Sequence, residues 1–444
     1  MQILAQLAHI DGWFALYLYV IAASVICTVI FRGVQFRYFI RSWSTAFTAG
    51  TGDKKAQAGD MTPVQAFINT LSANLGNGTF AGMATAVHSG GPGAAIWAVL
   101  IGVVLMAVRF AEVYTSTEYG KNASRKISLG GPMLYLKAVP FGSVLSYVYG
   151  VFCLLFGLMI GNAMQANSVS LSLQKTLGDL GYPVNPLVIA VILLGFVSYV
   201  VLGGASRIIK ISDGIVPVKV LVFFTTSFIV LAYHYDKIVP ALSLMVTCAF
   251  NPTAVMGGLL GFTVQQAIHY GAQRSIMASE AGLGTAAVLF GFTGSKDSFQ
   301  SALMGMLSAF ISTAVCFLVA LCIVVSGVFS SGLTSAPLII AAYTTVFGAY
   351  AGVIVSFLSM SFGLGVLVTF AYVSRVVWLF LTGGRWASGI TVLYCAATLI
   401  GALIPVDKLW ALLSIPTTAL LLINLYGVVY LAPSLARSLY SKKV

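Results

Sequence analysis

Long apolar stretches alternate with short polar ones along the whole chain. Eleven of them come within a few residues of the roughly 20 apolar residues that a helix needs to cross a bilayer. We expect spanning helices over residues 13–31, 63–88, 92–119, 143–174, 186–204, 214–234, 253–272, 300–327, 346–381, 387–404 and 409–432. The alternation of single apolar and polar residues that marks a membrane barrel is missing. The pattern therefore predicts an all-α polytopic membrane protein.

Composition agrees with this pattern. Hydrophobic residues make up 59% of the chain and charged residues only 8%, against about 25% charged in a typical soluble domain. A water-soluble fold is excluded. Because no polar linker or low-complexity tract interrupts the chain, we expect residues 1–444 to form a single membrane domain.

Basic residues gather on one side of the expected membrane. When the chain is threaded through the bilayer, Lys175, Lys237 and Lys408 fall on one side and most of the other lysines and arginines on the opposite side. The positive-inside rule then places the amino terminus outside and residues 433–444 in the cytoplasm as a tail, as in a multi-pass protein of a cell inner membrane. The net charge of +12 is thus a topology signal and requires no nucleic acid partner.

Residues that carry enzyme or metal chemistry are sparse. The six cysteines lie within apolar stretches without a C-x-x-C pair, and the four histidines are scattered. No serine or cysteine sits in a recognisable nucleophile elbow. We therefore expect neither an enzyme nor a bound cofactor.

The second expected span contains a polar cluster at membrane depth. Asn74-Leu75-Gly76-Asn77-Gly78-Thr79 places two glycines and three polar side chains inside an apolar helix, and each glycine costs about 1 kcal/mol there. Polar groups at this depth are tolerated where they line protein or a cavity, and a broken helix offers backbone N–H groups to an anion. The alternative is a close helix crossing through small residues, which would account for the glycines but not for the asparagines.

The seventh span, five spans later, is also rich in glycine. It opens with Asn251-Pro252 and carries Gly257, Gly258 and Gly261. Two broken helices at equivalent positions predict two inverted repeats, over 62–236 and 250–432, with the helix at 13–31 as an extra element. This organisation is typical of a secondary transporter with a site at the bilayer midplane. A channel and a substrate-sensing receptor are the rival classes.

Several linked motifs resemble the alanine or glycine:cation symporter family. They are G-x-G, A-G-M-A-T-A, G-G-P-G-A and R-F-A-E between Asn69 and Tyr119, G-N-A-M-Q-A-N-S at Gly161–Ser168, G-G-x-x-R-I-x-K at Gly203–Lys210, and R-x-x-x-x-S-E-A-G-L-G at Arg274–Gly284. The likeness covers residues 60–330 well and the last hundred residues weakly. It implies the leucine-transporter fold and import of alanine, glycine or a similar small neutral amino acid, usually with sodium, by alternating access.

The resemblance also nominates site residues. For the substrate it implies Gly76, Asn77, Gly78 and Thr79 facing Gln165, together with unwound backbone at Gly258 and Gly261. For sodium it implies Ala73, Gly76 and Thr369. Independently, backbone amides of a broken helix suit a carboxylate, and the Gln165 carbonyl suits an ammonium group. The alternative for Gln165 is a hydrogen bond that ties two helices together.

Three positions depart from the family pattern. The usual G-T-G-N is Gly76-Asn77-Gly78-Thr79, which leaves the substrate's identity open, and Thr369 stands where the family carries a pair of hydroxyl residues. Lys219 replaces an apolar residue near the cytoplasmic end of the sixth span. It is expected to snorkel to the surface, the alternative being that its amine takes the sodium position and couples transport to protons.

Three further charged residues are expected within the membrane region. Arg109 and Glu112 are three residues apart on one helical face and predict an ion pair. Glu280 belongs to the S-E-A-G-L-G stretch. We expect all three to serve an inner gate or helix packing.

Overall fold

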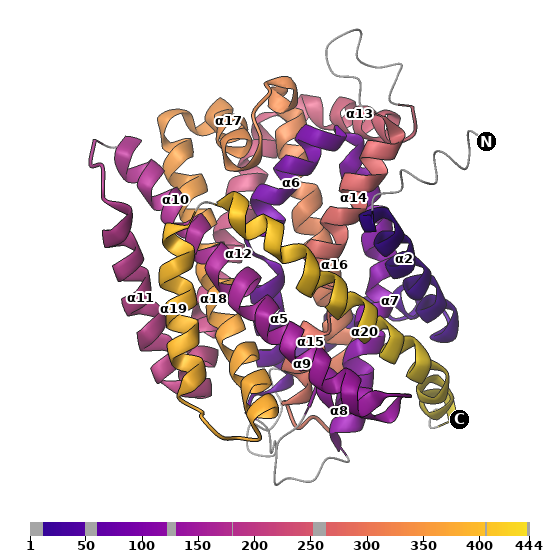
Figure 1. Cartoon of the computed structure of the whole chain (residues 1–444). Coiled ribbons are helices and arrows are strands. Elements are labelled where there is room, and N and C mark those ends of the chain that lie inside the picture. Colours follow the sequence, from indigo (N-terminus) through magenta and orange to yellow (C-terminus); the bar gives the residue numbers. More distant parts are fainter. Residues whose placement is uncertain are drawn as a thin grey trace, which may run out of the picture.

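The computed structural model describes residues 12–48, 60–121, 130–179, 181–251, 263–404 and 406–441, and all regular structure within these ranges is helical (Figure 1). The extra amino-terminal helix and the elements that follow it are α2 (Gly12–Ile30), α3 (Val34–Arg37) and α4 (Phe39–Thr48). The first set of spans comprises α5 (Pro63–Asn74), α6 (Asn77–Gly90), α7 (Gly93–Lys121), α8 (Pro132–Tyr135), α9 (Gly142–Leu158), η3 (Met159–Ala163), α10 (Met164–Asp179), α11 (Pro186–Leu202) and α12 (Gly204–Tyr233).

The second set follows a short helix, α13 (Ile238–Phe250). It comprises α14 (Val264–Ser279), α15 (Thr285–Gly291), α16 (Ser298–Val325), α17 (Ser335–Phe347), α18 (Ala351–Thr382), α19 (Gly389–Leu403) and α20 (Val406–Ser441). Short 3-10 turns lie at 136–138, 235–237, 328–330 and 348–350.

The described helices overlap all eleven expected spans, of which the seventh is described only from residue 263. Six helical stretches are long and apolar enough to cross a membrane, and three apolar helices are shorter. The pairs α5/α6 and α14/α15 form the two interrupted spans. Helix α20 continues past residue 433 to Ser441, with Pro433 inside it, so the described part of the expected tail is helical.

Elements five spans apart pack against each other. Helix α7 packs against α16, α10 against α18, α11 against α19, and α6 against α14, and α11 and α19 can be followed side by side in Figure 1. Packing of these four elements against their counterparts fits a 5+5 inverted repeat of the leucine-transporter type. Helix α2 stands outside these pairs and packs on α7 and α20.

The first interrupted span breaks where the sequence predicts it. Helix α5 starts with a capping box between Thr62 and Gln65 and ends at Asn74. Gly76 is extended (φ −111°, ψ −176°) and starts α6. A side chain does not fit at Gly76, because a Cβ atom there would lie 2.6 Å from Val366 of α18. The close approach of α18 therefore requires glycine at the break.

The described interruption of the second span lies after Ser279. Helix α14 ends at Ser279 because Glu280 adopts the left-handed conformation (φ 51°), followed by Gly282 (φ 95°) and Gly284 (φ 82°). These values are accessible to glycine and unusual for other residues. The expected break at Gly258 and Gly261 lies outside the described residues, and the described part of this span is continuous helix from Val264 to Ser279.

Candidate functional site

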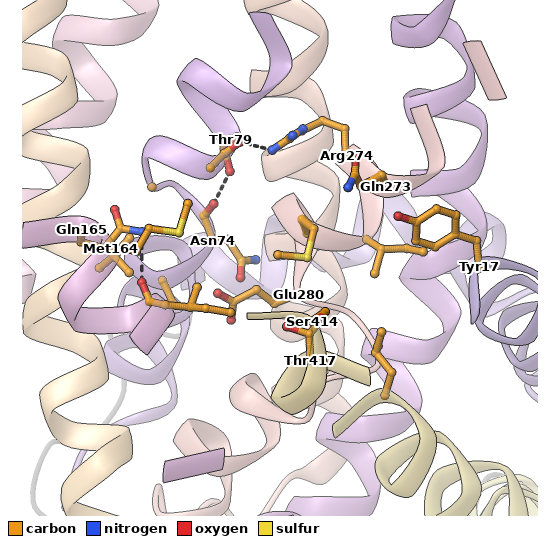
Figure 2. Close-up of a pocket in the computed structure, with 18 residues that line it drawn as sticks. Tyr17, Asn74, Thr79, Met164, Gln165, Gln273, Arg274, Glu280, Ser414 and Thr417 are labelled. Carbon is orange, nitrogen blue, oxygen red and sulfur yellow. Dashed lines mark hydrogen bonds between the residues drawn. The ribbon is translucent and has the colours of Figure 1, made fainter. Parts of the chain in front are cut away.

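A cavity of about 370 Å³ lies in the centre of the bundle, where the two interrupted helices meet (Figure 2). Its wall comes from α2, α5, α6, α10, α14, α18 and α20. Among the residues nominated from the sequence, those that line it are Ala73, Gly76, Gly78, Thr79, Gln165 and Glu280. Figure 2 shows Gln165 on one side of this cavity and Arg274 and Tyr17 on the other.

Gln165 faces the first helix break. It follows the π-helical turn η3, a type of turn that is frequent at functional sites. Its Nε2 donates to the Ile160 carbonyl (3.3 Å), whereas its Oε1 is buried without a hydrogen-bond partner. That Oε1 is 3.7 Å from where a Cβ of Gly76 would lie. Gln165 therefore presents an acceptor oxygen beside the break.

The side chains of Asn77 and Thr79 form hydrogen bonds that stabilise the first helix break. Asn77 accepts a hydrogen bond from Ser359 of α18 at its Oδ1 (2.7 Å) and is absent from the cavity wall. Its side chain thus ties α6 to α18 and does not narrow the cavity. The Thr79 hydroxyl donates to the Asn74 carbonyl and bridges the two half-helices.

Glu280, which was expected to serve an inner gate or helix packing, lines the central cavity. Helix α14 ends one residue earlier, so Glu280 lies at the break itself. Its Oε2 accepts a hydrogen bond from the Thr285 hydroxyl (2.6 Å) at the start of α15.

The predicted ion pair of Arg109 and Glu112 is confirmed, with 3.6 Å between Arg109 Nη1 and Glu112 Oε2. Both side chains are fully buried on α7. Arg109 donates to the carbonyl of Ser279, the last residue of α14, whereas Glu112 accepts from the backbone N–H of Gly284 (3.1 Å). Arg109 therefore binds the end of α14 and Glu112 binds the residue before α15, on the two sides of the second break.

Side chains that the sequence did not single out complete this arrangement. Asn424 of α20 donates to Glu112 (2.6 Å) and to the Gly282 carbonyl (2.8 Å). The Tyr149 hydroxyl donates to the Leu283 carbonyl (2.8 Å), and the Tyr135 hydroxyl donates to Asn424. These contacts join helices distant in sequence, which no local pattern could reveal.

Lys219 does not snorkel to the surface. It is fully buried in α12, and its ammonium donates to the carbonyls of Ser72 (3.2 Å) and Leu75 (3.0 Å), at the end of α5. The carbonyl of Leu75 would otherwise be left without an intrahelical partner, and a cation is favourable at this end of a helix. The expectation of snorkelling was wrong because α12 faces the α5 break at this residue.

The predicted sodium ligands are only partly brought together. Ala73 and Gly76 line the cavity, and Thr369 is buried on α18 with no hydrogen-bond partner for its hydroxyl. The Gly76 carbonyl already accepts from the backbone N–H groups of Thr79 (3.0 Å) and Phe80 (3.1 Å). This carbonyl is therefore engaged in the backbone hydrogen bonds of the first turn of α6.

Asn74 and Arg274 line the cavity, although the sequence did not nominate either of them as a site residue. Asn74 is buried, with neither atom of its carboxamide hydrogen-bonded. Arg274 donates to the Gly78 carbonyl (2.7 Å), and its guanidinium lies directly on the backbone at Gly82. Asn74 belongs to the polar cluster of the second span and Arg274 to the R-x-x-x-x-S-E-A-G-L-G motif. Their place in interrupted spans was the feature of the sequence that could have indicated a position at the cavity.

A central cavity bounded by two interrupted helices within an inverted-repeat bundle defines a polytopic membrane transporter. The family model described as "Sodium:alanine symporter family" matches residues 2–443. The chain belongs to this family.

Individual proteins agree with the family match. The chain is 28% identical to an uncharacterized transporter of Haemophilus influenzae, over 89% of this chain and 86% of that one. It is also 28% identical to the sodium/alanine symporter AgcS of Methanococcus maripaludis, over 84% of this chain and 82% of that one. Among solved structures, a substrate-bound, outward-open Na+-coupled sialic acid symporter has a similar fold, with a TM-score of 0.57 at 14% identity over 90% of this chain and 86% of that one.

Proposed function

We propose that the chain imports a small neutral amino acid of the alanine or glycine type together with sodium, by alternating access. The observation that carries this proposal is the cavity at the first helix break, which joins the start of α6 to the free acceptor oxygen of Gln165. The family membership supports the same class of substrate.

The start of α6 suits the substrate carboxylate. Asn77 and Gly78 are its first residues, and the first N–H groups of a helix have no carbonyl partner within that helix. The partial positive charge at this end attracts an anion. Gln165 Oε1, on the facing helix, then accepts a hydrogen bond from the substrate ammonium.

One part of the wall suits a short, uncharged side chain. Ile160, Met164, Met277 and Val366 contribute apolar surface to the cavity. Its volume of about 370 Å³ is near the lower end of the roughly 300–1,000 Å³ of ligand pockets. A small amino acid fits this space better than a large polar one.

Coupling to protons is the second candidate, because Lys219 stands at the end of α5. A buried ammonium on two carbonyls supplies the positive charge that a bound sodium ion would bring to the same helix end. Proton coupling or cation-independent exchange would follow if no sodium ion is required elsewhere in the site.

The membrane orientation belongs to the same proposal. We place the amino terminus outside and the carboxyl terminus in the cytoplasm of a cell whose inner membrane holds the protein, following the distribution of lysine and arginine.

Counterflow in proteoliposomes tests the class of activity. Vesicles loaded with unlabelled alanine should take up labelled alanine transiently above its equilibrium level, since a carrier exchanges substrates one for one. Glycine should compete, and glutamate should not. Uptake that never saturates and shows no counterflow would indicate a channel and contradict the proposal.

A further inference from the structure

Three arginines follow the end of α2 without an anionic partner. Arg32, Arg37 and Arg41, which form the basic strip, are exposed, and no acidic residue occurs between Phe31 and Thr48. Within the described ranges, none of the three guanidinium groups forms an ion pair. Because arginine stays charged and carries five N–H donors, the basic strip is able to bind an anion.

Two residues of the basic strip lie at the carboxyl end of α20. The Arg32 guanidinium lies over the Tyr440 ring, with its Cζ atom 4.4 Å from the ring centre. Arg37 also acts electrostatically on Tyr440, whose hydroxyl donates to the Phe31 carbonyl (2.8 Å). A guanidinium group that rests on a ring keeps its N–H donors in its own plane, where an anion can reach them.

Arg41 belongs to the same group of aromatic rings. Its Cζ atom lies 5.5 Å from the centre of the Phe299 ring on α16. Phe299 packs edge-to-face on Tyr38, with 5.1 Å between the ring centres, and Tyr38 acts electrostatically on Tyr440. The three arginines therefore lie along one set of packed rings that comes from segments distant in sequence.

The carboxylates of this region have other partners. Glu118 and Asp297 both act electrostatically on Tyr114, a neighbour of the same rings. Glu118 pairs with Lys121 (2.8 Å), and Asp297 accepts from the backbone N–H of Gln300 (3.0 Å) and caps α16. The basic strip thus keeps its positive charge.

Apolar side chains stand beside the basic strip on α4. Phe39 and Trp43 pack on Phe310 of α16, with 4.8 and 6.3 Å between ring centres. Ile40 and Phe47, two turns apart on one line of the helix, are 83% and 75% exposed. Exposed apolar and basic side chains on one helix are typical of a helix that lies in the membrane interface.

The two features together indicate a phospholipid. Guanidinium groups match the oxygens of a phosphate group with parallel N–H donors. A phosphate ion dissolved in water would leave Ile40 and Phe47 without a partner, whereas the acyl chains of a lipid cover them. In the proposed orientation the basic strip lies on the cytoplasmic side, and basic residues near that surface attract anionic lipids.

We propose that Arg32, Arg37 and Arg41 bind the headgroup of an anionic phospholipid, whose acyl chains lie against Ile40 and Phe47. The bound lipid holds α3 and α4 against α16 and the end of α20. This site is remote from the residues that line the central cavity, so the proposal stands independently of the proposed function.

Thermal unfolding of the purified full-length protein in detergent tests the site. The melting temperature is measured against increasing phosphatidylglycerol, and against phosphatidylcholine with the same acyl chains. Phosphatidylglycerol should stabilise the wild type in a saturable way and at lower concentration. Arg32→Gln, Arg37→Gln and Arg41→Gln together should raise the half-saturating concentration of phosphatidylglycerol by roughly tenfold or more, and should leave the response to phosphatidylcholine unchanged.

The control removes three positive charges elsewhere on the surface. It combines Lys137→Gln, Arg207→Gln and Lys210→Gln, and Arg207 lies over a tyrosine ring at the same 4.4 Å as Arg32. This variant should respond to phosphatidylglycerol as the wild type does. Gel filtration in detergent alone shows whether each variant is folded.

A second variant tests the apolar half of the site and keeps every arginine. Ile40→Ser with Phe47→Ser should also raise the half-saturating concentration of phosphatidylglycerol, because the acyl chains lose their contacts. Lysine at all three arginine positions, which keeps the charge, should bind phosphatidylglycerol better than glutamine there.

Three results would overturn the proposal. The first is equal stabilisation of the wild type and the triple glutamine variant by phosphatidylglycerol. The second is stabilisation of the wild type by inorganic phosphate to the same extent, which would indicate an anion site without lipid. The third is a native mass spectrum in which the wild type is a lipid-free dimer and the triple glutamine variant a monomer, which would assign the surface to a second copy of the chain.

Discussion

The ammonium nitrogen of Lys219 lies 3.0 Å from the carbonyl oxygen of Leu75, the residue that follows the last turn of α5. Helix α12 thereby brings the Lys219 amine to the first helix break. The same amine also lies 3.2 Å from the Ser72 carbonyl, so Lys219 contacts two carbonyls at the end of α5.

Replacing Lys219 with methionine should make transport more responsive to sodium. The substitution removes the amine that lies on the carbonyls of Ser72 and Leu75, at the end of α5 that carries the expected sodium ligand Ala73, and charges interact strongly in a poorly solvated interior. We expect the apparent sodium affinity for alanine uptake to rise by about tenfold or more, equivalent to roughly 1.4 kcal/mol. Lys237→Met, at an exposed lysine beyond α12, should change nothing. An unaltered sodium dependence in Lys219→Met would show that the ammonium does not act on the ion.

Gln165→Leu should weaken amino acid binding. The substitution removes the acceptor oxygen that lacks a partner in the cavity, and a hydrogen bond to a charged group is worth roughly 1.5–3 kcal/mol. The concentration of alanine at half-maximal uptake should therefore rise by about 10-fold to 100-fold. Gln174→Leu is the control on the same helix, because Gln174 bonds Ser170 and does not line the cavity. If Gln165→Leu and Gln174→Leu raised the alanine concentration at half-maximal uptake equally, Gln165 would have only a structural role.

The first half of the site could be predicted from the sequence because its signal is local. Gly76 and its polar neighbours stand together within one apolar span, and the structure breaks the helix there. The roles of individual side chains were less predictable. Asn77 turns to Ser359 of α18, a contact 282 residues away that no pattern along one helix can indicate.

Gly82→Ala should detach Arg274 from α6. An added Cβ would lie 1.9 Å from Arg274 Nη1, so the guanidinium must move and give up its bond to the Gly78 carbonyl. We expect a lower melting temperature, corresponding to about 1–3 kcal/mol, and slower alanine uptake. Gly195→Ala on α11, where an added Cβ meets nothing within 4 Å, should leave both unchanged. Normal stability and uptake in Gly82→Ala would mean that Arg274 does not hold α6 in place.

Asn424→Leu should destabilise the second helix break. It removes the donor to Glu112 and to the Gly282 carbonyl, and losing a partner of a buried charged group costs about 2–4 kcal/mol. Thermal unfolding in detergent measures the change. The double variant with Tyr135→Phe should cost less than the sum of the two single variants, because both residues belong to one network. Strict additivity would show that they act independently.

The second break was harder to predict than the first. Glycines at 257–261 drew attention to one part of the seventh span, whereas the described interruption begins at Glu280. The left-handed backbone of Glu280 is stabilised by Arg109, Glu112 and Asn424 from other helices. Tertiary contacts of this kind determine the backbone conformation of the S-E-A-G-L-G motif. The six residues of the motif alone do not predict this conformation.

Accumulation of labelled alanine in proteoliposomes under an inward sodium gradient, with the membrane potential held at zero, tests the central claim most directly. We predict that internal alanine rises transiently above the external concentration and falls as the gradient dissipates. The overshoot should be absent when choline replaces sodium and when both sides hold equal sodium. An overshoot that needs only an inward proton gradient would transfer the coupling to protons, and no accumulation under either gradient would contradict cation-coupled amino acid transport by this protein.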